Sequence, residues 1–449
     1  LEAQPMLLET WLRHQHRDDY WRHGSICEDW AAIRCPVCGR RQSPPREICA
    51  VCRVRNTEWV EVGPKGEMRM LEYVYYASPD PLTGDTRETP YGAIGVLLDG
   101  CRDEEVFWHL LNPAQLDRWF DATANAQYTR ALLFSTIFDI MSKVVCGGRS
   151  SVHAAYQASK QEISVSIASV YNKLNGIEPE TSAELVRYAA CRIAPIIEEL
   201  GGTTLAPLPG FRVKLLDGNC IEKTQHRLKE LRTLAAGPLP GKSLVVYDPV
   251  TRLPIDVFPC EDGHAQERSL LKTVLPTVAP KDVWVADRNF CTLDFTCEIA
   301  FRKGYFIIRE HKKYPCKPYG KEKYIGPVET GEVHQGRITV VDASGRKHTF
   351  RRIRVCLETQ TRDGDKEIFI ITNLPNKSAS ALEIAELYRG RWTIETAFQH
   401  LSEDLNSEIN TLGYPRAALF GFCVALVSYM TISVIKASLG SVYGADVVE

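Results

Sequence analysis

The chain has 449 residues, of which 44% are hydrophobic and 24% are charged, and its formal net charge is −2. This composition is typical of globular protein, and the length predicts two to four domains. Residues 1–118 carry a net charge of −5 and the remainder +3. The charge excludes nucleic-acid binding through bulk positive charge and permits binding only through local basic patches.

The fifteen cysteines bear on the compartment of the protein. The first residues show no basic segment followed by an apolar one, so we expect no secretory signal there. Most cysteines, such as Cys146 and Cys260, stand singly among apolar residues. This pattern predicts a reduced, cytoplasmic location, in which clustered cysteines bind metal instead of forming disulfides.

Residues 417–435 form an uncharged apolar run about long enough to span a bilayer. Small and polar residues, including Gly421 and Ser428, interrupt the run, and no basic cluster flanks it. We interpret it as a buried core helix, with a membrane span as the less favoured alternative.

Two CxxC pairs stand near the N-terminus, at Cys35, Cys38, Cys49 and Cys52. Four thiolates at this spacing predict one closed structural Zn²⁺ site, and disulfides are the less favoured alternative. Residues from about 35 to 110 resemble rubredoxin-like zinc ribbons fused to an OB-fold in acyl-CoA-associated proteins. Residues from about 9 to 34 resemble a short piece of CocE/NonD-type hydrolases, without a GxSxG nucleophile motif. We therefore predict a hydrolase-like fragment over 1–34 and a zinc ribbon with a partial OB-fold over 35–118.

Apolar residues recur at helical spacing from about Phe120 to Leu200 and predict a helical region over 119–210. Strand-like and helix-like runs then alternate, which is typical of an α/β domain, here over 211–449. Strand-like runs dominate from about 300 to 380 and predict a β-rich insertion. A single amphipathic helix is expected over residues 380–405.

Three carboxylates stand at positions suited to metal binding. Asp217 and Asp287 each follow an apolar strand, and Glu395 lies on the predicted final helix. Three such groups at one sheet edge can bind two Mg²⁺ or Mn²⁺ ions, which prefer oxygen ligands and catalyse phosphoryl transfer. Taken alone, an Asp at a strand end is more often a turn or cap residue.

The residues around these acids make the pattern specific. The motifs Asp217-Gly218-Asn219, Asp287-Arg288-Asn289-Phe290 and Tyr388-x2-Arg391-x3-Glu395 resemble the insertion-sequence-4 family of DDE transposases in order and neighbours. The resemblance extends from about Phe120 to the C-terminus. It implies an RNase H-like catalytic core with the β insertion, and catalytic metal ligands at the three acids. It also implies DNA contacts from Tyr388 and Arg391 and a DNA-binding role for the helical region over 119–210.

The resemblance also implies the partners: the transposon terminal inverted repeats, target DNA and a second copy of the chain, with no membrane. It implies a bacterial cytoplasmic protein, associated with the nucleoid when bound to DNA. The family's Lys seven residues after the catalytic Glu is replaced by Ser402, which leaves one phosphate contact unaccounted for. An ordinary ion pair on a solvated face is the alternative interpretation of Tyr388 and Arg391.

Further basic residues suit phosphate contact. Lys312 and Lys313 open a lysine-rich tract with interleaved tyrosines, and Arg351 and Arg352 form a second group. A solvated surface is the alternative for both. His264, Glu267 and Arg268 also match the family closely, and they lie either near the active site or at an ordinary helix N-terminus.

The sequence thus predicts a transposase that cleaves and joins insertion-sequence ends by two-metal phosphoryl transfer. The main alternative is a zinc-ribbon/OB-fold acyl-CoA-associated binding protein fused to an inactive transposase remnant. A third hypothesis is a DNA-binding protein that binds the ends without cutting them.

Overall fold

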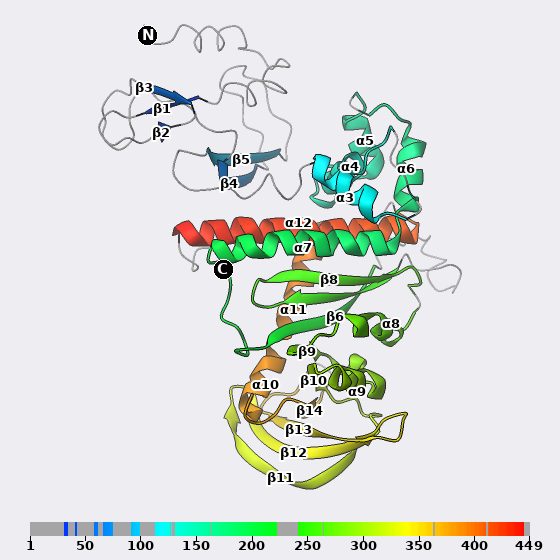
Figure 1. The fold of residues 1–449 in the computed structure, drawn as a ribbon, viewed down its shortest axis with the longest axis vertical. Coiled ribbons are helices and arrows are strands. Elements are labelled where there is room, and N and C mark those ends of the chain that lie inside the picture. The colour runs from blue at the N-terminus through cyan, green and yellow to red at the C-terminus, as the bar shows by residue number, and fades with distance from the viewer. Residues whose placement is uncertain are drawn as a thin grey trace. The chain divides into compact units, whose positions relative to one another are not determined.

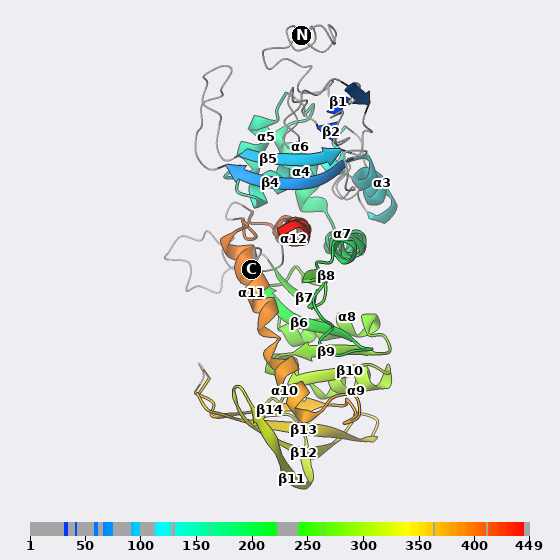
Figure 2. The same ribbon diagram turned by 90° about the vertical axis from the view of Figure 1, so that its left-hand side faces the viewer.

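The structure is a computed structural model. In the N-terminal part it describes five strands, and beyond them it describes residues 113–125, 127, 131–161, 163–221, 241–263, 265–361, 364–409 and 412–443. The chain divides into two compact units, one comprising Leu1–Asn112 with Ile435–Glu449 and the other Pro113–Val434. Figures 1 and 2 show the elements of both units.

The N-terminal unit contains two small antiparallel sheets. Strands β1 (Ala31–Arg34), β2 (Arg41–Gln42) and β3 (Glu58–Glu61) form one sheet in the order β2-β1-β3. Strand β4 (Gly66–Val74) pairs with β5 (Tyr91–Leu98) in the other. Strands β3, β4 and β5 agree with three strand-like runs of the sequence. The four cysteines of the CxxC pairs and residues 1–30 lie outside the described residues, so the zinc ribbon and the hydrolase-like fragment stay predictions.

Five helices open the second unit, and all but the first lie wholly within the predicted helical region over 119–210. They are α3 (Pro113–Thr123), α4 (Phe134–Val145), α5 (Val152–Ala158), α6 (Ile167–Gly176) and α7 (Pro179–Glu199). Ser151 and Ser166 begin α5 and α6, where each hydroxyl accepts a hydrogen bond from the backbone N–H three residues on. Phe120 stacks on Phe134 with ring centroids 4.4 Å apart, which joins α3 to α4 in one apolar core.

Nine strands form one mixed sheet in the order β11-β12-β13-β14-β10-β9-β6-β7-β8. Strand β9 is parallel to both β6 and β10, and the other pairs are antiparallel. The predicted β-rich insertion therefore extends the same sheet beyond β10 (Figure 1). The strands are β6 (Arg212–Cys220), β7 (Lys242–Asp248), β8 (Leu253–Cys260), β9 (Asp282–Ala286), β10 (Tyr305–Arg309), β11 (Lys317–Val328), β12 (Gly331–Val341), β13 (Lys347–Leu357) and β14 (Glu367–Thr372).

Helices cover both faces of this sheet, so the central strands are apolar on both sides. Helices α8 (Glu267–Val274) and α9 (Leu293–Phe301) contribute to the core that contains Leu216 and Trp284. Helices α10 (Ala381–Arg389) and α11 (Trp392–Glu403) contribute to the opposite core, with Leu215 and Val285. Two short 3₁₀ helices, η3 (Leu275–Thr277) and η4 (Arg288–Phe290), flank β9. Alternation along β6 and β9 thus decides which side chains face α10 and α11.

The last helix, α12 (Pro415–Tyr443), contains the uncharged apolar run. Its residues up to Val434 lie beside α7 (Figures 1 and 2), and Phe420 packs edge-on against Phe134. A Cβ at Gly421 would lie 3.0 Å from Cε of Met141, so the glycine allows a close approach. Among the described residues, this helix is long and apolar enough to cross a membrane, but 67% of its most apolar window is buried. The burial agrees with the predicted core helix.

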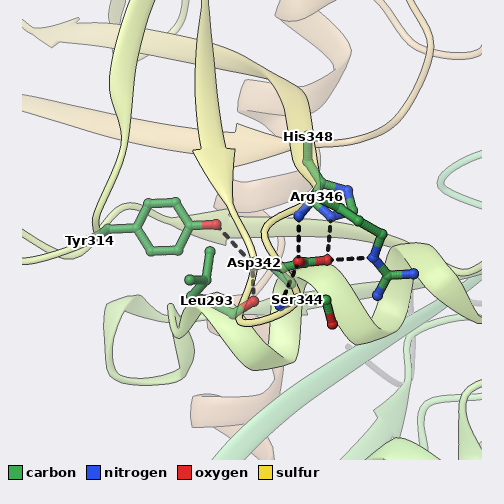
Figure 3. A network of polar contacts seen from close by, with 7 residues as sticks. Leu293, Tyr314, Asp342, Ser344, Arg346 and His348 are labelled. Atoms are coloured by element: carbon green, nitrogen blue, oxygen red, sulfur yellow. Dashed lines mark hydrogen bonds and ion pairs between the residues drawn. The ribbon is translucent and has the colours of Figure 1, made fainter.

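A hydrogen-bonded turn connects β12 to β13 (Figure 3). The Asp342 carboxylate accepts hydrogen bonds of 2.9 Å from the backbone N–H groups of Ser344 and Arg346, and it bonds His348 Nε2 at the same distance. The bond with His348, followed by the contacts of Arg346, holds the pKa of Asp342 well below its usual range. This network fixes the turn that sets the register of the insertion.

Candidate active site

Asp217 and Asp287 lie at neighbouring positions on two parallel strands. Leu216 of β6 is paired with Ala286, the last residue of β9, so an aspartate follows each member of this pair: Asp217 within β6 and Asp287 as the cap residue of η4. Leu215 and Val285, two residues before these acids, belong to the core beneath α10 and α11. Because side chains alternate along a strand, both aspartates face the same helices. Strand β6 continues to Cys220, so Asp217 lies within the strand and not at its end.

The predicted helix over 380–405 is wrong in one respect, because the structure divides it into α10 and α11. Gly390 ends α10, and Arg391 is the N-terminal cap residue of α11. Glu395 lies in the first turn of α11, and α11 contacts β6. Arg391 and Glu395 therefore lie one turn apart at the start of α11, and Arg391 contacts Asp217 on β6.

Arg391 joins two of the three acids. Its Nη1 lies 3.2 Å from Oδ2 of Asp217, and its Nη2 lies 2.6 Å from Oε1 of Glu395. The guanidinium carbon is 6.0 Å from the ring centroid of Tyr388, and both residues are buried. The structure therefore brings together Tyr388, Arg391, Glu395 and Asp217 from one sequence motif and one distant strand.

Burial raises the pKa of Asp217 to about 6. The positive charge of Arg391 and the Gly218 N–H oppose this shift, whereas the negative charges of Asp287 and Glu395 add to it. Desolvation and carboxylate repulsion together exceed the attraction of one guanidinium. The contacts of Arg391 thus do not fully compensate for the burial of Asp217 and the repulsion among the three carboxylates.

The donor set of this site fits a divalent metal. Three carboxylates supply only oxygen, which Mg²⁺ and Mn²⁺ prefer, and a cation would relieve their mutual repulsion. Within the described part of the chain, no group of three or more His, Cys, Asp or Glu side chains is already arranged to hold a metal. The Arg391 guanidinium contacts two of the three acids, Asp217 and Glu395, from a position between them.

Arg309, which ends β10 beside the acids, is a further residue of this region that no sequence motif predicted. Ile308 is paired with Ala286, so Arg309 follows at the position next to Asp287. Its Nη2 lies 2.5 Å from Oδ2 of Asp365, and Nη1 of Arg288 lies 3.6 Å from the same oxygen. Asp365 therefore binds two arginines that flank Asp287. The only sequence signal was a lone arginine at the end of an apolar strand.

Lys312 and Lys313 follow β10 and are exposed. Burial lowers the pKa of His311, and the positive charges of Arg268, Lys313 and Arg288 lower it further, whereas Asp287 raises it. These electrostatic effects indicate that Lys313 belongs to a basic group at the same sheet edge as Asp287.

Arg351 and Arg352 have different surroundings. The buried Arg351 guanidinium donates hydrogen bonds to the carbonyl oxygens of Leu374 and Ala379, and burial lowers its pKa to about 10. Arg352 pairs with Glu310 through two bonds of 2.5 and 2.9 Å and lies over the Phe369 ring. Both side chains are engaged within the protein, so we leave them out of the DNA-contacting group proposed below.

The start of α8 lies close to the aspartates. The Glu267 carboxylate is so near Gly218 that a Cβ there would lie 2.6 Å from its Cδ. Nε of Arg268 donates a 2.7 Å hydrogen bond to the carbonyl oxygen of Asn289. Glu267 and Arg268 therefore contact the residues that follow Asp217 in β6 and Asp287 in η4. His264 and the side chain of Ser402 lie outside the described residues.

Part of the chain, including several of these residues, is similar to known proteins. Residues 239–430 match the family model of a transposase DDE domain. The matched segment includes Asp287, Arg391 and Glu395, whereas Asp217 precedes it. A Sinorhizobium fredii protein named "Putative transposase y4zB" is 25% identical over 173 residues, which are 36% of this chain and 44% of that protein. The chain therefore spans less than half the length of this relative.

Proposed function

We propose that the chain is a DNA transposase of the insertion-sequence-4 type, which cleaves insertion-sequence ends and joins them to target DNA. One observation carries the proposal: Asp217 and Asp287 stand side by side on one sheet face, and Arg391 links Asp217 to Glu395. The transposase DDE domain match over residues 239–430 supports the same assignment.

The sheet order supports an RNase H-like catalytic core. In the run β8-β7-β6-β9-β10, the first three strands are antiparallel and the last two are parallel to β6. Strands β11 to β13 follow β10 in sequence, and β14 then pairs with β10. We infer that β11–β14 are the β insertion of an RNase H-like domain.

We infer that Asp217, Asp287 and Glu395 are the residues that hold Mg²⁺ or Mn²⁺. When bound, the metal would activate water or a 3′-hydroxyl and stabilise the leaving oxygen of the scissile phosphate. The protein itself would orient the DNA. The exposed Lys313 supplies positive charge beside Asp287. Arg309 and Arg288 also flank Asp287 but share Asp365, so a phosphate would compete with this carboxylate for guanidinium groups that suit bidentate binding.

Strand β11 extends the proposed DNA-binding surface. Residues 317–325 of this edge strand are exposed, with Lys317, Lys321 and Lys323 among Tyr319 and Tyr324. Exposed lysines bind phosphates, and exposed aromatic rings can stack on unpaired bases. The partners would be the terminal inverted repeats and target DNA, bound by a cytoplasmic homodimer.

Replacing two of these lysines in Lys321→Glu/Lys323→Glu should weaken duplex binding at every sequence tested. The slope of log Kd against the logarithm of the salt concentration should fall by about two, because each phosphate contact contributes about one to this slope. Fluorescence anisotropy at several salt concentrations measures both effects. Lys272→Glu/Lys377→Glu, which makes the same charge change at exposed sites elsewhere, is the control. An equal loss in both double variants would contradict a specific role for β11.

The proposed function is tested with the full chain and the terminal inverted repeats found in the DNA that flanks its gene. We expect Mg²⁺-dependent nicking at the boundary of the repeat, followed by joining to a target plasmid, and no such products from a scrambled duplex. The absence of cleavage with both Mg²⁺ and Mn²⁺ on the paired ends would refute the proposal.

A further inference from the structure

We propose that Arg391 is a positioning residue that serves as the internal counter-cation of the carboxylate site and couples metal binding to DNA binding. In the metal-free protein its guanidinium pairs with both Asp217 and Glu395 and partly offsets their negative charge. A DNA phosphate then takes over the guanidinium and leaves both acids available to a divalent cation. This inference rests on the proposed function, because it assumes that DNA and metal meet at this site.

The geometry of Arg391 suits a cationic side chain that pairs with the acids while no metal is bound. One guanidinium bridges carboxylates from two elements, with Nη1 3.2 Å from Asp217 and Nη2 2.6 Å from Glu395. Its side chain is 8% exposed, so these contacts form in a desolvated position. The Arg391 backbone N–H donates to the Tyr388 carbonyl oxygen at 3.1 Å, which fixes the residue at the junction of α10 and α11.

The contacts compete with metal binding for the same groups. A carboxylate oxygen that accepts a short hydrogen bond from a guanidinium has less capacity left for a cation. A divalent ion between Asp217 and Glu395 would also repel the guanidinium across a short, poorly solvated distance. A metal ion bound to these two acids would therefore weaken their contacts with Arg391, and the Arg391 contacts would weaken metal binding.

A phosphate is the partner that best replaces the two carboxylates. The planar guanidinium fork binds two phosphate oxygens as readily as it binds carboxylate oxygens. Arg309 and Arg288 also flank Asp287, where both pair with Asp365, so a phosphate at this edge would meet Arg391 first and compete with Asp365 for the other two arginines. By linkage, a phosphate that removes Arg391 from the acids tightens metal binding, and the metal tightens phosphate binding by the same factor.

The experiment measures Mn²⁺ affinity of the full chain without DNA, from the electron paramagnetic resonance signal of free Mn²⁺. Arg391→Met should bind Mn²⁺ about tenfold more tightly than the wild type, within the usual range of coupling between sites. The control is Arg389→Met, since Arg389 lies two residues away and pairs with Glu329 and Glu386. The control should match the wild type within about twofold. Unchanged or weaker Mn²⁺ binding in Arg391→Met would overturn the inference.

Two further measurements test the inference even if Arg391→Met does not fold correctly. Arg391→Lys keeps the charge but loses the fork, so its Mn²⁺ affinity should fall between those of the wild type and Arg391→Met. In the wild type, a short terminal-repeat duplex should also tighten Mn²⁺ binding, after subtraction of Mn²⁺ bound by the duplex alone. A wild-type Mn²⁺ affinity that the duplex leaves unchanged would refute the coupling.

The outcomes separate this inference from the proposed function. The Mn²⁺ pattern without any strand cleavage would refute the transposase activity and leave the counter-cation role intact. Cleavage at the inverted repeats with equal Mn²⁺ affinity in the wild type and Arg391→Met would refute the counter-cation role alone.

Discussion

Replacing either Asp287 or Glu395 with its amide should reduce metal-dependent strand cleavage at least about 1,000-fold. A catalytic metal contributes several kcal/mol of transition-state stabilisation, and each 1.36 kcal/mol corresponds to a factor of ten in rate. Asp287→Asn and Glu395→Gln keep the shape of the side chain but remove the negative charge that holds the metal. We therefore expect the loss to fall on the rate of cleavage and not on the fold.

Single-turnover cleavage of a labelled terminal-repeat duplex measures this loss, and circular dichroism checks the fold. Glu386→Gln is a matched control, because Glu386 lies on α10 and pairs with Arg389 without contacting the three acids. The control should cleave at the wild-type rate. Cleavage by Asp287→Asn or Glu395→Gln within about tenfold of the wild type would exclude the three acids as the metal site.

The sequence predicted most strands and helices of the second unit because their apolar residues follow regular periods. The positions of Asp217 and Asp287 were predictable in part, since each follows a short apolar run in the sequence. Their common face depends on the parallel register of Leu216 with Ala286, which two separate strand motifs do not specify. The motif resemblance, and not the periodicity, selected these two among the chain's many acids.

The break between α10 and α11 illustrates what periodicity leaves out. Apolar spacing continues through Gly390, and an isolated glycine within such a pattern is usually tolerated in a helix. Whether the helix divides depends on the packing of Ile384 and Ile394 in the core against the sheet. The contacts of Arg391 with Asp217 follow from that tertiary packing, so local sequence could not predict them.

Basic residues were the least predictable part of the site. Arg351 and Arg309 both occur in strand-like sequence, yet one donates to buried carbonyl groups and the other lies beside Asp287. Strand order decides the difference, because β10 neighbours β9 whereas β13 is separated from β9 by β14 and β10. Charge alone carries no information on strand order.

Asp217→Asn should stabilise the metal-free protein at neutral pH even though it abolishes metal binding. Burial, aided by Asp287 and Glu395, raises the pKa of Asp217 to about 6, against about 4 in an unfolded chain. The folded protein therefore binds this proton more tightly than the unfolded chain does. The resulting stabilisation is complete below pH 4 and is lost as the pH rises to about 6. Two pKa units correspond to at most about 3 kcal/mol.

Urea unfolding in a metal chelator at pH 4, 5, 6 and 7 measures this contribution. The free energy of unfolding of the wild type should decrease relative to that of Asp217→Asn between pH 4 and 6, and Glu386→Gln should follow the wild type. Mg²⁺ at pH 7 should stabilise the wild type and leave Asp217→Asn unchanged, because only the wild type offers the carboxylate. Parallel pH profiles for the wild type and Asp217→Asn would show that Asp217 does not destabilise the metal-free fold. The ionised carboxylate of Asp217 would then not be destabilised in the metal-free fold, and a bound metal would have no such destabilisation to relieve.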